Sequence, residues 1–262
     1  MHNSQIWGWE IPVYLFLGGI AAGLMILSAI TPRRESRAMR LLPLLAPVAL
    51  SIGMAALFLD LDYKLHVFRF YTSFRVTSPM SWGSWILLAI YPATVLYAFN
   101  PTRTLQRANL ILGIALGAYT GILLGTLSAR PLWASMFLAP LFLVSGFSTA
   151  AAVTMFLPIA DDEREVVRRW DVAAIAAEVV LLAFLFLDLA ADARGRAAVA
   201  QFFGGSFTAP FWAFVVVIGL AAPLVLEIVE TRRHLRPTAL TPALLLIGGL
   251  ALRWTFVAAG QM

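Results

Sequence analysis

Eight continuous apolar segments constrain this chain more than any other feature. Each is long enough to cross a bilayer as a helix, and short polar connections separate them. With 61% hydrophobic and only 13% charged residues, the composition excludes a water-soluble domain. The runs lack the strict alternation of a membrane β-barrel. We therefore predict an all-α integral membrane protein, a single polytopic domain over residues 1–262. Its predicted spans are residues 11–30, 41–59, 82–99, 108–127, 135–157, 172–190, 211–229 and 243–260.

The basic residues between the spans predict the orientation. Twelve arginines lie in the first, third, fifth and seventh connections, against six Lys and Arg residues on the opposite side. Connections rich in Lys and Arg stay in the cytoplasm, and an even number of spans leaves both termini together. We therefore expect both termini on the outer side of a bacterial or archaeal cytoplasmic membrane. The basic residues are too scattered to suggest nucleic-acid binding, so membrane lipid is the expected surrounding.

The first apolar run is not preceded by the basic segment of a signal peptide, so we expect it to be retained as a span. The protein has no cysteine, and His2, His66 and His234 all fall outside the predicted spans. A thiolate-bound iron–sulfur cluster is therefore excluded, and neither a membrane-embedded bis-histidine haem nor a metal site is expected. Any redox role must use a diffusible carrier and the metal centres of a partner.

The start of the first span combines polar chemistry with small residues. Glu10 and Tyr14 are four residues apart, so a helix places them on one face. Gly19 and Gly23 form a small-xxx-small pair that lets another helix approach closely. An acid and a phenol at the rim of a membrane span are costly in lipid, which makes them candidates for a functional site.

Further polar residues lie at membrane depth. Asp60 closes the second span, and Tyr119 falls roughly opposite a glycine ladder in the fourth span. Asp171 and Glu178 are seven residues apart in the sixth span and share a face. For Tyr119 the alternative is a hydrogen bond between helices, and for Glu178 a neutral acid bonded inside the bundle. That ladder, which predicts close helix packing, is Gly113, Gly117, Gly121 and Gly125.

Arg253, in the eighth span, cannot realistically lose its proton and needs a counter-charge. Glu10, Asp60 and Asp188 are candidate partners at similar predicted depth. A purely structural ion pair is an alternative to a role in proton movement.

An ordered set of motifs resembles the NrfD-like membrane subunits, a family that includes the membrane subunit of polysulfide reductase. The motifs are WGWEIPVYLFLGGIAAG, LDLD, SPMSWGSW, AYTG, PLWASMFLAPLFLVSG and GGLALRWTFVAAGQ. The resemblance implies a haem-free subunit with eight helices in two four-helix bundles. Its substrate would be a quinone or quinol, menaquinone or ubiquinone. Its partner would be a four-cluster, ferredoxin-like iron–sulfur subunit on the outer face, connected to a molybdopterin enzyme or a multihaem cytochrome.

The resemblance also implies roles for individual residues. Tyr119 matches the tyrosine of the family's YTG motif, which hydrogen-bonds the quinone. Glu10 and Tyr14 stand at or near positions where polysulfide reductase has an asparagine and a histidine, so this protein departs from the family there. Asp60, Glu178 and Arg253 match charged positions to which proton transfer is attributed.

We expect Tyr119 and Tyr14 to orient the quinone headgroup while Glu10 exchanges its proton and Asp60 relays protons outward. A second hypothesis makes Asp171 and Glu178 a proton conduit from the cytoplasm. A secondary transporter or proton channel would explain the buried charges equally well. A passive anchor for an extrinsic enzyme is a further alternative. The long second connection, rich in aromatic residues, is a candidate docking surface.

Overall fold

This computed structural model describes residues 7–31, 35–60, 79–126, 130–233 and 238–262. Throughout these ranges the regular structure is helical, and eight helical segments are long and apolar enough to cross a membrane, which confirms the predicted fold class. The spanning segments are α1 (Glu10–Ile30), α2 (Arg37–Asp60), α4 (Pro79–Phe99), α5 (Arg103–Gly125), α6 (Leu138–Met155), α7 (Asp161–Ala191), η3 (Phe211–Ala221) continued by α10 (Ala222–Arg233), and α11 (Leu240–Gly260).

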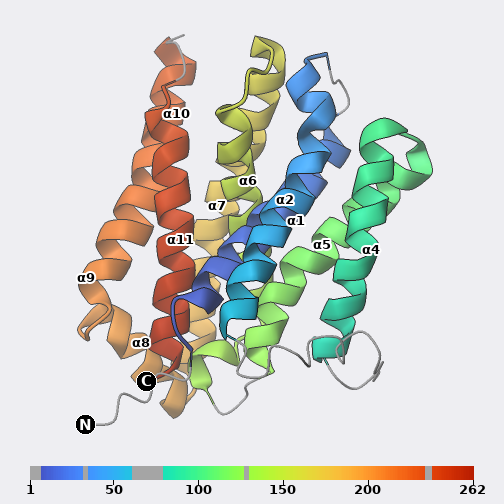
Figure 1. The fold of residues 1–262 in the computed structure, drawn as a ribbon. Coiled ribbons are helices and arrows are strands. Elements are labelled where there is room, and N and C mark those ends of the chain that lie inside the picture. Colours follow the sequence, from blue (N-terminus) through green and yellow to red (C-terminus); the bar gives the residue numbers. More distant parts are fainter. Residues whose placement is uncertain (1–6, 32–34, 61–78, 127–129, 234–237) are drawn as a thin grey trace.

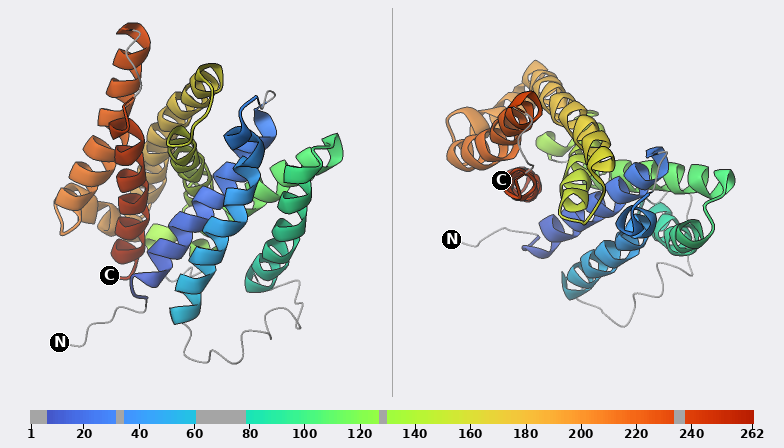
Figure 2. Two further views of the ribbon diagram at one scale, coloured as in Figure 1. Left: turned by 45° about the horizontal axis from the view of Figure 1, so that its top comes forward. Right: turned by 90° about the horizontal axis from the view of Figure 1, so that it is seen from above.

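The eight spans form the two expected four-helix bundles. In the first bundle, α1 packs against α2 and α5, and α4 packs against the same two helices. In the second, α6 packs against α7 and α11, and the segment η3–α10 closes the ring. Helix α1 also contacts α6 and α11, and α5 contacts α6, so these two helices join the two bundles, which lie side by side when viewed from above (Figure 2).

The start of α1 and the end of α11 lie at the same end of the molecule, at the bottom of Figure 1. The Trp7 amide donates to Gln261 Oε1 at 2.9 Å, and Gln261 Nε2 donates to the Trp7 carbonyl at 3.2 Å. The Trp7 ring also stacks on Trp133, with centroids 5.2 Å apart. We call this end the terminal end and the opposite one the far end.

Glycines allow α1 to cross α6 at close range. A Cβ placed on Gly23 would overlap the Gly146 carbonyl and Ala150, and one placed on Gly146 would meet the Gly19 backbone at 2.8 Å. Association of helices in lipid depends on such close packing because the solvent is as apolar as the side chains. The predicted role of the Gly19–Gly23 pair is thereby confirmed.

The glycine ladder of α5 packs in the same way. Gly113 faces Met25 and Ala22 of α1, and Gly121 faces Ala139 of α6. Helix α5 therefore lies in the angle between α1 and α6, and its opposite face is turned toward α4.

Three features of the helices differ from the predicted spans. Helix α7 begins at Asp161, well before residue 172, and its 31 residues extend about 46 Å, beyond a hydrocarbon core of about 30 Å. Helix α8 (Ala193–Phe203) occupies what was expected to be a simple polar connection. Segment η3 is a π-helix. It ends just before Pro223, which cannot donate to the carbonyl four residues earlier and crowds it, a known cause of helix distortion.

Two short helices complete the terminal end. They are η2 (Pro131–Trp133), between α5 and α6, and α9 (Thr208–Pro210), which leads into η3. The Trp133 indole in η2 donates to the Phe256 carbonyl of α11 at 2.9 Å, so this connection is fixed to the second bundle.

Candidate functional site

Glu10 and Tyr14 lie one turn apart on α1, at two different depths. Glu10 is partly exposed, and its carboxylate folds back over Gly8, where an added Cβ would overlap Oε2. Tyr14 is only 3% exposed and packs against Gly53 of α2. The acid therefore lies at the terminal end of the helix, while the phenol lies inside the first bundle.

Tyr119 lies near the terminal end of α5 and is also buried. Its neighbour Thr120 faces α1, 3.6 Å from the position of a Cβ on Gly18. Tyr119 instead points to α4, where a Cβ on Gly83 would overlap its ring and hydroxyl group. The structure thus brings Tyr119 of the AYTG motif onto Gly83 of the SPMSWGSW motif. The sequence analysis did not single out Gly83, although a glycine inside a spanning helix can indicate such a close approach.

The first bundle thus contains two of the predicted site residues, Tyr14 on α1 and Tyr119 on α5, helices that pack against each other. Asp60 ends α2 at the same end of the molecule. Its side chain lies outside the described residues, as does the candidate docking segment 61–78. The proposed proton relay through Asp60 therefore stays a prediction.

Arg253 is completely buried where α1, α6 and α11 meet. Its guanidinium nitrogens donate to the carbonyls of Gly249 (2.8 Å), Phe142 (3.3 Å) and Leu15 (3.4 Å), and to Ser145 Oγ (3.0 Å). These four hydrogen bonds connect three helices from both bundles. The acceptor on α1, Leu15, follows Tyr14 directly, so this positive charge lies immediately behind one wall of the first bundle.

The acid that interacts electrostatically with Arg253 is Glu178, on α7. It was not among the three candidate partners. Of these, Asp188 instead accepts a 2.6 Å hydrogen bond from Ser135, and Glu10 folds over Gly8. For Glu10 and Asp188 the expectation failed because depth along each helix was compared without knowing which helices are neighbours, whereas the side chain of Asp60 lies outside the described residues.

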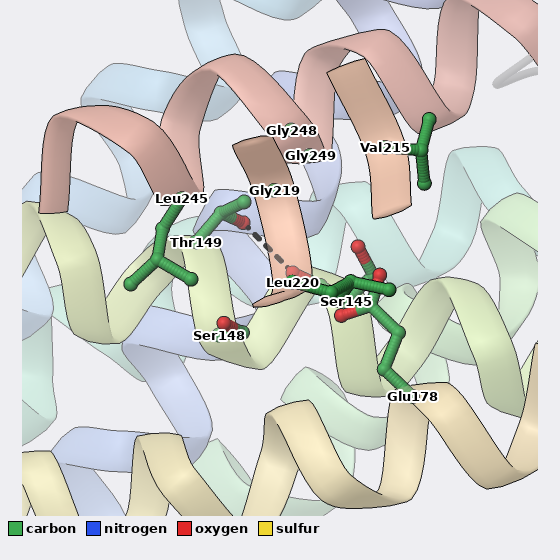
Figure 3. A pocket seen from close by; sticks show the side chains of 10 residues that line it. All are labelled: Ser145, Ser148, Thr149, Glu178, Val215, Gly219, Leu220, Leu245, Gly248 and Gly249. Atoms are coloured by element: carbon green, nitrogen blue, oxygen red, sulfur yellow. Dashed lines mark hydrogen bonds between the residues drawn. The ribbon is translucent and has the colours of Figure 1, made fainter. Parts of the chain in front are cut away.

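Glu178 lies beside a small polar cavity inside the second bundle. The cavity measures about 10 Å³, room for about one water molecule. Figure 3 shows the Glu178 side chain extending toward Ser145 of α6, with which it interacts. Because Ser145 Oγ accepts from Arg253, its own hydrogen is available to Glu178. The hydroxyls of Ser148 and Thr149 line the same cavity.

Close backbone packing shapes the other side of this cavity. Gly219 of the π-helix lies against Gly248 of α11, where a Cβ on either glycine would overlap the other backbone. With Val215, Leu220, Leu245 and Gly249, these two glycines form the rest of the lining (Figure 3).

Asp171 lies deeper toward the far end of α7 and is fully buried. Its Oδ1 accepts a 2.6 Å hydrogen bond from Ser148. It also interacts with Glu227 of α10, which is 1% exposed. The sequence analysis did not consider Glu227. Its position inside the predicted seventh span could have identified Glu227 as a candidate, but none of the motifs lies on that helix.

Two further observations concern metal binding and a second groove. In the described ranges, no three His, Cys, Asp or Glu side chains are grouped so that they could hold a metal ion. A larger groove of about 410 Å³ lies between α7, α8 and η3, with an apolar lining that includes Phe186, Phe203 and Trp212. It contains none of the predicted site residues, so we do not place chemistry there.

Comparison with known proteins shows the family of this chain. The family model described as "Polysulphide reductase, NrfD" matches residues 1–262. "Protein NrfD" of Escherichia coli K12 is 30% identical, over 99% of this chain and 96% of the relative. The C subunit of polysulfide reductase from Wolinella succinogenes is 26% identical, again over 99% of this protein and 96% of the relative. The chain is therefore a multi-pass membrane protein that belongs to the NrfD polysulphide reductase family.

Proposed function

We propose that this protein is the quinone-reactive membrane subunit of a respiratory oxidoreductase complex. It exchanges electrons between the quinone pool of the membrane and an iron–sulfur subunit on the outer face. The name of the Wolinella relative, the C subunit of a reductase, supports an assembly of several subunits. Family membership over the whole sequence supports the respiratory role.

One observation carries the proposal. Tyr119 is a buried phenol near the terminal end of the first bundle, in the same bundle as Tyr14 and directly beside the start of α4. A phenolic hydroxyl can donate a hydrogen bond to a quinone carbonyl. The partly exposed Glu10, one turn from Tyr14, lies between this interior and the water at the terminal end.

The mechanism assigns headgroup binding to the two tyrosines and proton transfer to the two acids. Quinol oxidation releases two electrons and two protons, and quinone reduction takes them up. Tyr119 and Tyr14 orient the headgroup through hydrogen bonds, which fixes its distance from the partner's metal centres. Glu10 accepts or donates the two protons one after the other in general acid–base fashion, and Asp60 is assigned the transfer of each proton to or from the outer water. The electrons are exchanged with a four-cluster, ferredoxin-like subunit, which connects to a molybdopterin enzyme or a multihaem cytochrome.

The test is quinol turnover by the assembled complex. Tyr119→Phe removes only the hydroxyl and should lower turnover about tenfold or more, because a lost hydrogen bond worth about 1.4 kcal/mol in the transition state costs a factor of ten. Glu10→Gln should have a larger effect at unchanged assembly, since the amide cannot exchange the proton. Unchanged turnover in both variants would refute the assignment. Loss of quinone-analogue binding would separate the redox role from transport or passive anchoring.

A second candidate function is proton movement through the second bundle. Glu178 and Asp171 are both buried in α7. Ser148 donates to Asp171, Ser145 contacts Arg253 and Glu178, and both hydroxyls line the cavity. Buried carboxyl groups connected by hydroxyls are the usual components of a proton path. In sealed vesicles, Glu178→Gln should lower the number of protons moved per electron, and an unaltered ratio would reject the conduit.

A further inference from the structure

Asp171 has an incomplete set of hydrogen bonds. It is 0% exposed, and Ser148 satisfies Oδ1 at 2.6 Å. Its second oxygen, Oδ2, is buried and receives no hydrogen bond from any described residue. A buried acceptor without a donor is costly, and buried polar atoms in folded proteins are nearly always paired. No amide, hydroxyl or amine of the described residues donates to this oxygen, so the missing donor must be a group that gains a proton.

The group beside Asp171 is a second carboxyl group. Glu227, on the neighbouring α10, is 1% exposed and interacts directly with Asp171. The two acids come from different spans, so the pairing results from the packing of α7 against α10.

Other charged groups near the pair are already engaged. Arg168, one turn before Asp171 on α7, interacts with Glu227 but also forms an ion pair with Glu165. Glu230, one turn beyond Glu227 on α10, accepts hydrogen bonds from the amide and hydroxyl of Thr238 at 3.1 and 2.9 Å.

The remaining charges lie on the side of the polar cavity. Glu178 on α7 also interacts with Asp171, while Arg253 on α11 is held by its own four acceptors. Two ionised carboxylates in contact inside a membrane protein would repel each other and would both have lost their hydration. A single proton between them removes the repulsion and supplies the missing donor.

We propose that Asp171 and Glu227 form a carboxyl pair that holds one proton between them. One acid donates to the other, and the pair carries one negative charge in place of two. The ligand is a proton and not a metal ion, because the described residues nearby do not form a group of three metal-binding side chains.

The location of the pair suggests where its proton is exchanged. Glu227 lies in the last two turns of α10, and Glu230 lies one turn closer to the far end. On the other side, Ser148 contacts Asp171 and also lines the cavity beside Glu178. A role for the pair in proton movement rests on the proposed conduit. The sharing of one proton by the two acids requires neither the conduit nor the quinone reaction.

The test is infrared spectroscopy of the purified complex at neutral pH, where ordinary Asp and Glu side chains are ionised. The wild type should show the C=O stretch of a protonated carboxyl group that shifts when the water is replaced by D2O. Glu178→Gln should retain this band, and Asp171→Asn with Glu227→Gln should abolish it completely. The matched control Asp162→Asn, which removes an exposed acid from the start of the same helix, should leave the spectrum unchanged.

Isotope labelling provides a version of the test without substitutions, in case a variant does not fold. In the wild type, ¹³C labels on aspartate and on glutamate carboxyls should each shift the band, because the proton is shared between the two residue types. A spectrum without a protonated carboxyl band, or a band that the double variant retains, would overturn the proposal. So would a band that disappears on addition of sodium ions, because the pair would then bind sodium.

These results are distinguishable from failure of the proposed function. Quinol turnover and the number of protons moved per electron are measured separately on the same variants. A present band with an unaltered proton ratio would leave the shared proton in place and reject only the conduit.

Discussion

Two functional candidates, Tyr119 and Arg253, each occupy space that is free because the residue opposite is a glycine. Tyr119 can pack against α4 at this point only because residue 83 is a glycine. The same holds for Arg253, whose Nη2 lies 2.8 Å from the position of a Cβ on Gly19. At the residue scale, the glycines that face these two side chains therefore decide where the polar groups lie.

Gly83→Ala should therefore act like a substitution of Tyr119. The new methyl group would occupy the space of the phenol and displace its hydroxyl, so quinol turnover should fall about tenfold, as for Tyr119→Phe. Turnover of the assembled complex is the measurement. Gly204→Ala is the control, because a Cβ there meets nothing within 4 Å. Full activity of Gly83→Ala would show that Tyr119 need not lie on α4.

At the scale of whole helices, α1 is the largest part of the junction between the bundles, with α5 beside it. It packs against α2 and α5 within the first bundle and against α6 and α11 in the second. Its contact with α6 depends on backbone approach at Gly23 and Gly146, which leaves no room for a side chain.

Gly23→Ala should destabilise the protein, whereas Gly18→Ala on the same helix should not. The added Cβ at position 23 would overlap the Gly146 carbonyl and Ala150, and overpacking of this kind costs about 1–3 kcal/mol. At position 18 the nearest atom is Thr120 Cγ2 at 3.6 Å, an ordinary contact. Thermal unfolding of the detergent-purified protein, followed by tryptophan fluorescence, compares the two. Equal midpoints would contradict the close crossing.

The whole molecule has two chemically different ends. The terminal end contains Glu10, Tyr14 and Tyr119, whereas the far end contains the first turn of α7 and most of the basic connections. Glu163, at the far end, joins two connections by accepting hydrogen bonds from the amides of Glu35 and Ala160. The predicted orientation places the terminal end outside, with the proposed quinone chemistry, and the basic connections in the cytoplasm.

The absence of cysteine allows a direct test of this orientation. Met262→Cys, at the exposed C-terminus, should react with a membrane-impermeant maleimide in intact cells with a permeabilised outer membrane. Asp162→Cys, at the exposed start of α7, should react only after the inner membrane is opened. The reverse pattern would place the proposed quinone site on the cytoplasmic side.

The sequence determined the fold class and most of the spans. Backbone polar groups cannot remain unpaired in lipid, so an apolar run of sufficient length becomes a helix whatever its neighbours are. The close-packing roles of Gly19, Gly23 and the ladder in α5 were predictable for a related reason, since small residues at helical spacing allow close approach.

Only the tertiary structure decided which of these residues meet. The pairing of Tyr119 with Gly83, of Arg253 with Ser145 and Glu178, and of Asp171 with Glu227 each joins side chains from different spans. Hydropathy gives the depth of a residue along its own helix, but not the neighbouring helix or the rotation about the helix axis. Those depend on side-chain packing across the bundle, and the π-helix before Pro223 changes that rotation in the seventh span.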